Sequence, residues 1–302
     1  MTAVPGSAGN VRGIAAMLVS QAAFIANDTM IKLAAAELPA GQAIFLRGLA
    51  TCAIAFVLAW LAGALTYRVH PQDKPRLGIR VVGELGSTFL YLFALFNMQI
   101  ADATAIIQFV PLAITAGAAL ILGEAVGWRR WAATLVGFVG VMIVIRPGTS
   151  AFNAWSLVAL ASVAFMVLRD LITRRLSADL PTLFVTLLTS VGVTLSALLL
   201  APFEAWRMPS GRESGLLAGA AVFLFLGYYF IIEAMRAGDV SVVSPFRYSV
   251  IISAIVAGIV VFDEWPDRWK SIGTLIVVSA GLYTFMRERT RAREARGEGG
   301  AG

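Results

Sequence analysis

Runs of about 20 apolar residues, separated by short polar and charged stretches, recur along the whole chain. A helix of about 20 apolar residues crosses the hydrocarbon core of a bilayer, which is about 30 Å thick. Because a helix satisfies its own backbone hydrogen bonds, such runs predict transmembrane helices. We expect ten spans, at about residues 11–34, 42–65, 77–99, 103–123, 128–146, 153–175, 181–202, 213–235, 240–262 and 268–287.

The second half of the chain echoes the first. The paired positions are Asp102 and Asp239, Pro111 and Pro245, and Glu124 and Glu264. Each half then holds five spans, and an odd number turns the second copy upside down in the membrane. Inverted repeats are typical of secondary transporters, because exchanging the conformations of the two halves opens a central site to alternate sides.

These patterns predict an all-α polytopic membrane protein with ten transmembrane helices in two inverted five-helix repeats. The first repeat covers residues 1–148 and the second residues 149–287, with a seam near Arg146. Residues 288–302 are charged and rich in glycine, so we expect a disordered cytoplasmic tail there.

Composition supports the membrane assignment. Hydrophobic residues make up 59% of the chain and charged residues 14%, whereas a soluble domain carries about 25% charge. The sequence pI of about 9.9 could suggest a nucleic-acid partner, but the basic residues lie in loops between the apolar runs. We therefore interpret them as topology signals beside anionic lipid, and expect no nucleic-acid binding.

The placement of lysine and arginine predicts the orientation. With the N-terminus inside, most basic residues fall on the inner side. The outer side holds only Arg146, Arg207, Arg212, Arg268 and Lys270. Both termini should therefore be cytoplasmic. Arg12 and the apolar run after it imitate a cleaved leader, but Asn27, Asp28 and Lys32 favour a retained first span.

Polar residues cluster in the first two spans. Asp28 and Lys32 are four residues apart on one helix face, with Asn27 beside them, and Arg47 can approach from the same outer side. An ionisable side chain at mid-membrane costs roughly 2.5–3.5 kcal/mol on insertion scales, so these side chains should face protein or water. They could form a self-neutralising ion-pair cluster, or act directly in gating or coupling.

Spans 3 and 4 each carry a polar stripe. Glu84 and Tyr91 mark the first stripe, and Gln108 with Pro111 marks the second. Stripes at helical spacing indicate faces turned away from lipid, where the side chains either join helices or line a cavity. Pro111 removes a hydrogen bond in mid-span, so we expect a kink there.

In the second half, Arg247 lies about two turns inside the membrane by this count. Asp170, Glu233 and Glu84 fall near the same depth and are its candidate partners. Arg247 could form a structural salt bridge or bind a substrate carboxylate. Tyr228 and Tyr248 lie in the neighbouring parts of spans 8 and 9.

Spans 5 and 10 have no charge in their apolar middles. Gly137 and Gly140, and Gly273 with Gly281, give them small faces for close helix contact. We assign this pair to scaffolding or to a homodimer interface, and expect little binding there.

Several chemistries have no residues to support them. The only histidine, His70, lies in a basic loop, which excludes a histidine metal cluster or a Ser-His-Asp triad. No G-x-x-x-x-G-K-[ST] motif is present for ATP hydrolysis. We expect a protein that is not an enzyme, holds no metal or cofactor, and transports on a gradient or by exchange.

Three segments of the sequence carry a family resemblance. The first comprises Asp28, Lys32 and Arg47 across the first two spans. The second is residues 105–124, with Pro111 and Glu124, and the third is residues 233–264, with Pro245, Arg247 and Glu264. Together they resemble the EamA-type members of the drug/metabolite transporter superfamily. The resemblance implies a carrier in the bacterial inner membrane, with spans 1–4 and 6–9 around a central cavity and spans 5 and 10 outside. One departure is Asp263, where a glycine would commonly precede the glutamate.

The first functional hypothesis is an exporter of amino acids, with aromatic and other large neutral ones preferred. The second is an uptake carrier for a nucleoside, S-adenosylmethionine or riboflavin-like metabolite, and the third is a membrane scaffold that transports nothing. The residues expected to bind substrate are Phe24, Asn27, Tyr91, Gln108, Tyr228, Arg247 and Tyr248. The residues expected in gating or ion pairs are Asp28, Lys32, Arg47, Glu84, Asp170 and Glu233.

Overall fold

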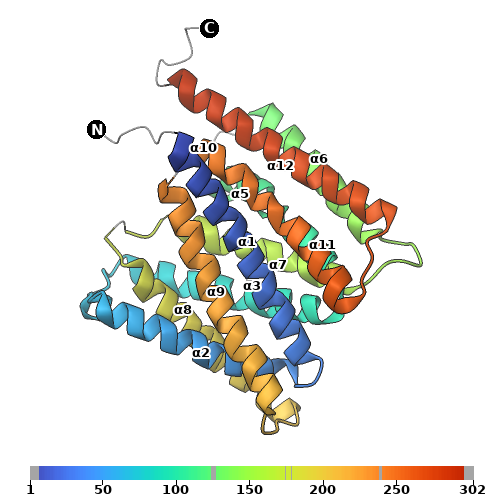
Figure 1. Ribbon diagram of the computed structural model, residues 1–302. Helices are drawn as coiled ribbons and strands as arrows, with labels where there is room; N and C mark the ends of the chain where they lie inside the picture. Colours follow the sequence, from blue (N-terminus) through green and yellow to red (C-terminus); the bar gives the residue numbers. More distant parts are fainter. Residues whose placement is uncertain (1–6, 124–126, 174, 178, 238–239, 296–302) are drawn as a thin grey trace. The chain divides into compact units, whose positions relative to one another are not determined.

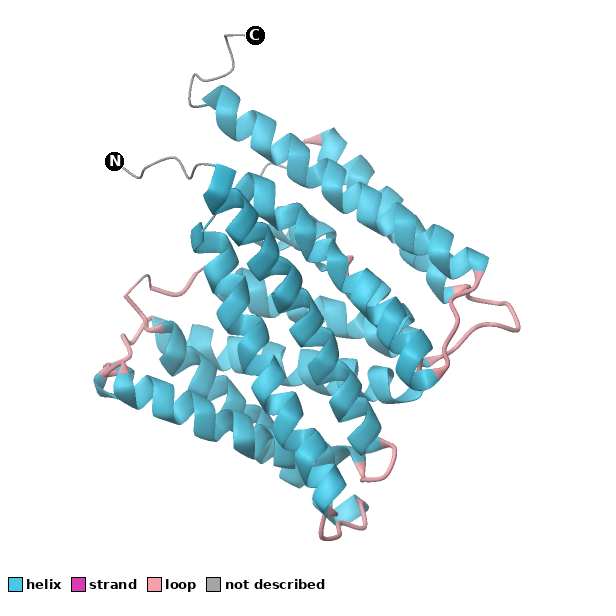
Figure 2. Ribbon diagram, in the orientation of Figure 1, coloured by secondary structure: helices cyan, strands magenta, loops and turns pink. Residues whose placement is uncertain are grey.

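A computed structural model describes residues 7–123, 127–173, 175–177, 179–237 and 240–295. The regular elements in these ranges are all helices joined by loops, with no strand (Figure 2). The helices are α1 (Ser7–Ala35), α2 (Ala40–Leu61), η1 (Ala64–Thr66), α3 (Asp73–Asn97), α4 (Ile100–Ile107), α5 (Val110–Leu122), α6 (Trp128–Ile145), α7 (Trp155–Thr173), α8 (Thr182–Ala197), η2 (Leu198–Phe203), α9 (Gly211–Ala237), α10 (Val240–Val243), η3 (Ser244–Tyr248), α11 (Ser249–Phe262) and α12 (Arg268–Ala295).

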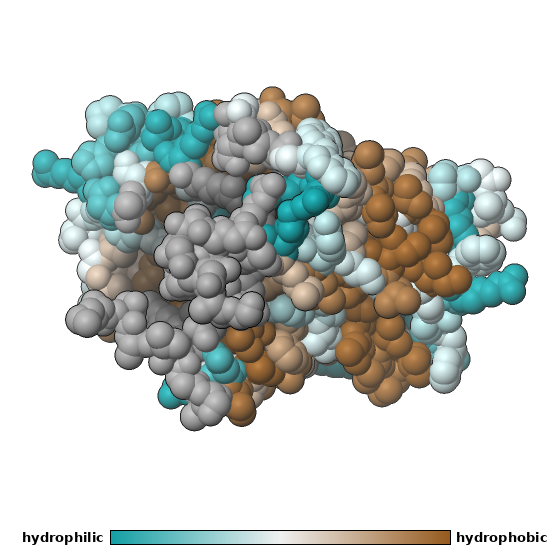
Figure 3. Space-filling model, turned by 90° about the horizontal axis from the view of Figure 1, so that it is seen from above, coloured by the Kyte–Doolittle hydropathy of each residue, from teal (hydrophilic) through white to brown (hydrophobic). Residues whose placement is uncertain are grey.

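Ten helical segments within the described residues are long and apolar enough to cross a membrane, which confirms the predicted all-helical, ten-span class. Their outer faces carry large exposed apolar side chains, such as Trp60, Leu120 and Val260. The view in Figure 3 shows broad hydrophobic areas bordered by hydrophilic residues. Such surface suits lipid, which is as apolar as these side chains.

The predicted kink in span 4 is present. The span consists of α4 and α5, with a turn at Gln108 and Phe109 between them. Pro111 has no backbone N–H to donate to the carbonyl of Ile107, and its ring crowds that carbonyl. The helical ladder therefore breaks one turn before the proline. Phe109 instead donates to Ile106 at 3.1 Å, a tighter turn.

Span 9 differs from the single helix that we expected over residues 240–262. It is divided into α10, η3 and α11, and Pro245 lies at the first turn of η3. The same proline chemistry explains both breaks, at Pro111 and at Pro245.

Helix α5 ends at Gly123 (φ +69°), and α11 ends at Asp263 (φ +53°), both in the left-handed conformation. Asp263 thus takes the backbone role that glycine has at the end of the first copy. Aspartate tolerates this conformation better than most residues do. The predicted hinge at Gly123-Glu124 is only half visible, because Glu124, like Asp239, lies outside the described residues.

Helix α12 continues to Ala295, beyond the expected end of the span near Arg287. Residues 288–295 consist mostly of arginine, glutamate and alanine, which are strong helix formers. The prediction of a disordered tail from residue 288 is therefore too early, because the helix ends at Ala295. Residues 296–302 lie outside the described residues.

The chain divides into two compact units. Unit 1 holds the described parts of Met1–Ile25, Ile100–Phe152 and Leu226–Gly302, and unit 2 holds Ala26–Gln99 and Asn153–Phe225. Each unit therefore combines spans from both predicted halves. Helices α1 and α9 each contribute to both units.

In unit 1, α6 packs along α12 (Figure 1). A Cβ atom on Gly140 would lie 2.9 Å from the carbonyl oxygen of Gly273, and one on Gly273 would lie 2.6 Å from that of Gly140. The predicted small faces are thus confirmed at Gly140 and Gly273 as a contact between α6 and α12 of one chain, whereas Gly137 packs against Leu112 and Gly281 packs against Tyr248. The end of α6 also meets the start of α12 through the ion pair of Arg146 and Asp267, so the two helices are antiparallel.

In unit 2, α2 packs against α8 and α3 against α7. Gly41 lies against Leu200, and Gly48 lies against Thr194, so α2 and α8 are also antiparallel. In both units, then, spans that occupy equivalent places in the two halves pack in opposite directions. An inverted duplication requires this relation.

Candidate functional site

A buried polar cluster in unit 2 joins three helices, and we call it the Asp28 cluster. Its members are Asn27 and Asp28 of α1, Arg47 of α2 and Tyr91 of α3. The Tyr91 hydroxyl donates to Asp28 Oδ2 at 2.5 Å, and Asn27 Nδ2 donates to Asp28 Oδ1 at 2.8 Å. Arg47 Nη1 donates to Asn27 Oδ1 at 3.5 Å. The sequence predicted the approach of Arg47 to Asn27 and Asp28, and the geometry confirms it.

Burial makes these contacts necessary. Asn27 is 3% exposed and Arg47 is 9% exposed. A charge in such a place is tolerated only when it is hydrogen-bonded and compensated. Lys32, one turn after Asp28, donates to the carbonyl oxygen of Met98 at 2.6 Å. The cluster thus presents an acid, a base, an amide and a phenol within one membrane-spanning region.

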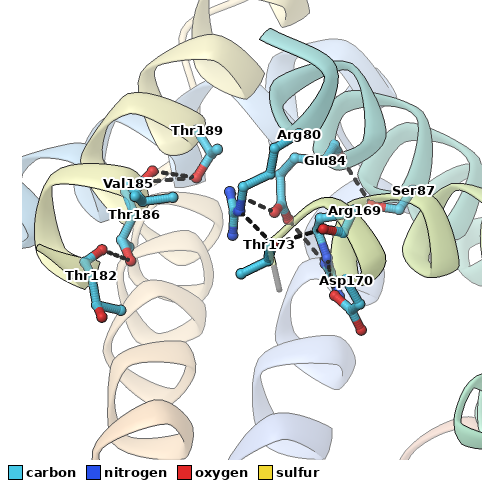
Figure 4. A network of polar contacts seen from close by, with 10 residues as sticks. All are labelled: Arg80, Glu84, Ser87, Arg169, Asp170, Thr173, Thr182, Val185, Thr186 and Thr189. Atoms are coloured by element: carbon cyan, nitrogen blue, oxygen red, sulfur yellow. Dashed lines mark hydrogen bonds and ion pairs between the residues drawn. The ribbon is translucent and has the colours of Figure 1, made fainter. Parts of the chain in front are cut away.

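A second cluster in unit 2 holds the other predicted acids, Glu84 and Asp170. Arg169 of α7 bridges them, with Nη1 3.3 Å from Glu84 Oε1 and Nε 2.8 Å from Asp170 Oδ1 (Figure 4). Arg80 lies 3.7 Å from Glu84 Oε2 and donates to Thr173 Oγ1 at 3.0 Å. Two cations and two anions therefore balance at the α3–α7 contact.

Close backbone approach sets this geometry. A Cβ atom on Gly83 would lie 3.1 Å from the Arg169 Cα, and one on Gly86 would collide with the ring of Phe165. Glycine at these two positions lets α3 and α7 pack tightly enough for Arg169 to reach Glu84. The arrangement is a four-charge network that fastens two helices together.

Two of the predicted aromatic residues of unit 1, Phe24 and Tyr228, are in contact. The rings of Phe24 and Tyr228 lie 5.3 Å apart in an edge-to-face arrangement. Gly227 makes room for Phe24, and the Ser20 hydroxyl donates to the Gly227 carbonyl at 2.7 Å. Tyr228 is nevertheless 53% exposed, so it has surface left for a ligand.

The three acids proposed as partners of Arg247 form ion pairs with other residues. Glu233 pairs with Arg12 in unit 1, and Glu84 and Asp170 pair with Arg169 in unit 2. Arg247 lies in η3, is exposed, and has no hydrogen bond or ion pair to any described residue. Depth along a helix could be counted from the sequence, but the direction of the side chain depends on the break at Pro245.

The remaining predicted residues, Gln108 and Tyr248, lie apart from each other in unit 1. Gln108 lies in the turn between α4 and α5, partly exposed. The Tyr248 hydroxyl lies against Gly281 of α12. Within each unit, the predicted site residues therefore make separate contacts.

The sequence analysis missed a clasp at one end of unit 2. Glu213, whose side chain is 1% exposed, accepts hydrogen bonds from both terminal nitrogens of Arg207. The Gln42 side chain accepts from the Arg207 backbone N–H at 3.2 Å. The hydrogen bonds that Arg207 donates to Glu213 raise the pKa of Arg207 above its ordinary value. No helical periodicity marks such loop contacts, so no pattern along the chain predicts them.

Comparison with known proteins agrees with this architecture. The profile of the EamA-like transporter family matches twice, over residues 11–146 and 153–286. A riboflavin transporter of Vibrio cholerae is 33% identical over 68% of this chain and 70% of its own length. An S-adenosylmethionine uptake transporter of Rickettsia felis is 27% identical over 92% and 93% of the two chains.

A pseudopaline exporter of Pseudomonas aeruginosa is 26% identical over 89% of this chain and 94% of its own length. One solved crystal structure covers 91% of this chain and 98% of its own, with a TM-score of 0.63 and 21% identity, which supports the fold. Since the two profile matches together cover most of the ten spans, the chain belongs to the EamA-like transporter family and is a multi-pass membrane transporter.

Proposed function

We propose that this transporter imports a heteroaromatic metabolite of the riboflavin or S-adenosylmethionine class across the bacterial inner membrane, by alternating access of two inverted halves. The observation that carries the proposal is the set of relatives. Two relatives that align with at least two thirds of the chain are a riboflavin transporter and an S-adenosylmethionine uptake transporter. Both substrates combine a flat ring system with polar groups.

The residues available for such a ligand support the proposal. Tyr228 keeps half of its surface exposed inside a span, and Phe24 supports its ring edge-to-face. An exposed aromatic face can stack on a flat heterocycle, which is worth about 1–3 kcal/mol for a nucleic-acid base. In unit 2, and independently of Tyr228, the Asp28 cluster holds a carboxylate and a guanidinium, which are groups that bind polar substituents.

Arg247 favours a second candidate, export of amino acids or of compounds built like them. Its guanidinium has no partner among the described residues and suits a carboxylate. One relative is an exporter, of pseudopaline. Since the relatives above name no simple amino acid, we rank this candidate below heteroaromatic uptake.

Transport by purified full-length protein in proteoliposomes tests the proposal. Labelled riboflavin and labelled S-adenosylmethionine are offered in parallel with labelled phenylalanine. We expect uptake of at least one of the first two above protein-free vesicles, with excess phenylalanine having no effect. Transport of phenylalanine alone would overturn the proposal in favour of the amino-acid candidate.

Two further measurements complete the test. An imposed pH gradient that accelerates uptake would indicate proton coupling, and an unchanged rate would indicate facilitated diffusion or exchange. A triple alanine variant at Glu84, Gln108 and Arg247 separates transport from a scaffold role. We expect it to lose transport, whereas a scaffold would keep its cellular function without these polar side chains.

A further inference from the structure

A pocket of about 410 Å³ lies within unit 1, between α4, α11 and α12. Helix α12 packs mainly on α6, and α11 packs mainly on α4, so α11 and α12 stand apart where the pocket forms. Its walls are largely apolar and include Ile252, Ile255, Leu275 and Val278. A pocket of this size is in the range that holds small molecules.

The pocket opens on the surface that faces lipid. Ile252 is 67% exposed and Leu275 is 65% exposed, and Val256 and Val260 continue the same apolar surface along α11. A ligand can therefore reach the pocket from the bilayer. The pocket is also long: along α12 its lining runs from Lys270 to Val278, which is about 12 Å of helix.

One end of the pocket is polar. Lys270 Nζ lies 2.6 Å from Asp102 Oδ2, and both side chains are largely buried. This end coincides with the start of α12, where Trp265 and Trp269 are exposed and Arg268 stacks over the Trp269 ring at 5.6 Å. Tryptophan and arginine in such a place mark the level of lipid headgroups.

The pocket therefore has a polar mouth, formed by the ion pair of Lys270 and Asp102 with Arg268 near it, and an apolar slot below it. We propose that it binds one glycerophospholipid, with an acyl chain in the slot between α11 and α12 and the phosphate at Arg268 and Lys270. An ion pair that lines a groove open to hydrocarbon loses solvation on that side. The ester and phosphate oxygens of a phospholipid would accept hydrogen bonds there, and a bare acyl chain could not.

The far end of the slot allows a test between hydrocarbon and a polar ligand. It contains Ser249, whose hydroxyl is buried and has no hydrogen-bond partner among the described groups. A polar ligand would depend on that hydroxyl, and an acyl chain would not. The Ser249→Ala variant thus separates the two occupants.

Native mass spectrometry of the full-length protein tests the site, after delipidation in mild detergent and titration with phosphatidylethanolamine or, in a parallel arm, phosphatidylglycerol. Leu275→Trp and Val278→Phe fill the slot at two positions along α12. Losing the burial of two methylene groups corresponds to about tenfold in affinity, so we expect at least that loss for the first bound lipid.

Leu135→Trp is the matched control, because Leu135 is 60% exposed on α6 and lines no part of this pocket. It and Ser249→Ala should bind lipid like the natural protein. Equal lipid binding by all variants would overturn the proposal, as would a loss with Ser249→Ala. Displacement of the lipid by riboflavin or S-adenosylmethionine would also overturn it, because the pocket would then belong to the transport path. This readout measures lipid and does not depend on the proposed substrate.

Discussion

Replacing Tyr91 by phenylalanine tests the Asp28 cluster with the smallest change. The variant keeps the ring and removes only the hydroxyl that donates to Asp28 Oδ2 at 2.5 Å. Asp28 then keeps the hydrogen bond from Asn27 at 2.8 Å. The buried carboxylate loses one of two donors, and no water replaces it at low cost.

The size of the effect depends on the charge of the acceptor. Neutral hydrogen bonds between membrane helices contribute about 0.6 kcal/mol on average. Hydrogen bonds to a charged group contribute about 1.5–3 kcal/mol. Since Asp28 lies beside Arg47, we expect the charged value to apply, and Tyr91→Phe to lower the free energy of unfolding by about 2 kcal/mol, roughly 30-fold in the folding equilibrium.

Unfolding by denaturant in detergent measures this difference. Tyr229→Phe is the matched control, because Tyr229 is 53% exposed on α9 and its hydroxyl has no hydrogen bond to a described residue. We expect the control to change stability by less than about 0.5 kcal/mol. If Tyr91→Phe were as neutral as the control, the hydroxyl would not hold Asp28, and the cluster would need another explanation.

Three further predictions rest on other contacts. Gly273→Ala should lower the free energy of unfolding by about 1–3 kcal/mol, because the new methyl group meets a carbonyl oxygen of α6. The control Gly215→Ala, where a methyl group meets nothing, should raise it by up to about 1 kcal/mol, and equal effects in denaturant unfolding would contradict the packing of α6 on α12. Pro111→Ala should restore the helical hydrogen bonds between α4 and α5 and slow substrate uptake without loss of stability. An unchanged uptake rate would show that the helix break has no role in transport. Hydrogen bonds from His70 and Tyr67 hold the pKa of Asp179 below its ordinary value. This carboxylate therefore stabilises the fold above about pH 3.9 and loses its contribution as the pH falls through the lowered pKa, so Asp179→Asn should flatten that part of the acid unfolding profile.

Much of the fold could be predicted because it depends on periodic signals. Ten apolar runs became ten spans, and Pro111 broke its span as proline chemistry requires. Gly140 and Gly273 were identified as small faces, and they meet across α6 and α12. Each of these features depends on residue type and spacing along one helix, which a sequence displays directly.

Contacts between helices were harder to predict. The acids proposed as partners of Arg247 form ion pairs with Arg12 and Arg169, and the sequence did not show that span 9 is divided by a 3-10 turn at Arg247. Tyr91 was expected to contact substrate, and its hydrogen bond to Asp28 was not foreseen. Arg207 and Glu213 join through a loop whose course no periodicity describes. Such pairs depend on helix rotation and loop path, which spacing does not fix.

Counterflow in proteoliposomes tests most directly that the protein is a carrier for heteroaromatic metabolites. Vesicles are loaded with unlabelled riboflavin or S-adenosylmethionine, and a trace of the labelled compound is added outside. A carrier with one site open to alternate sides exchanges bound molecules, so the account predicts a transient accumulation of label above its equilibrium level with at least one of the two compounds. Label that only approaches equilibrium, or does not enter with either compound, would contradict it.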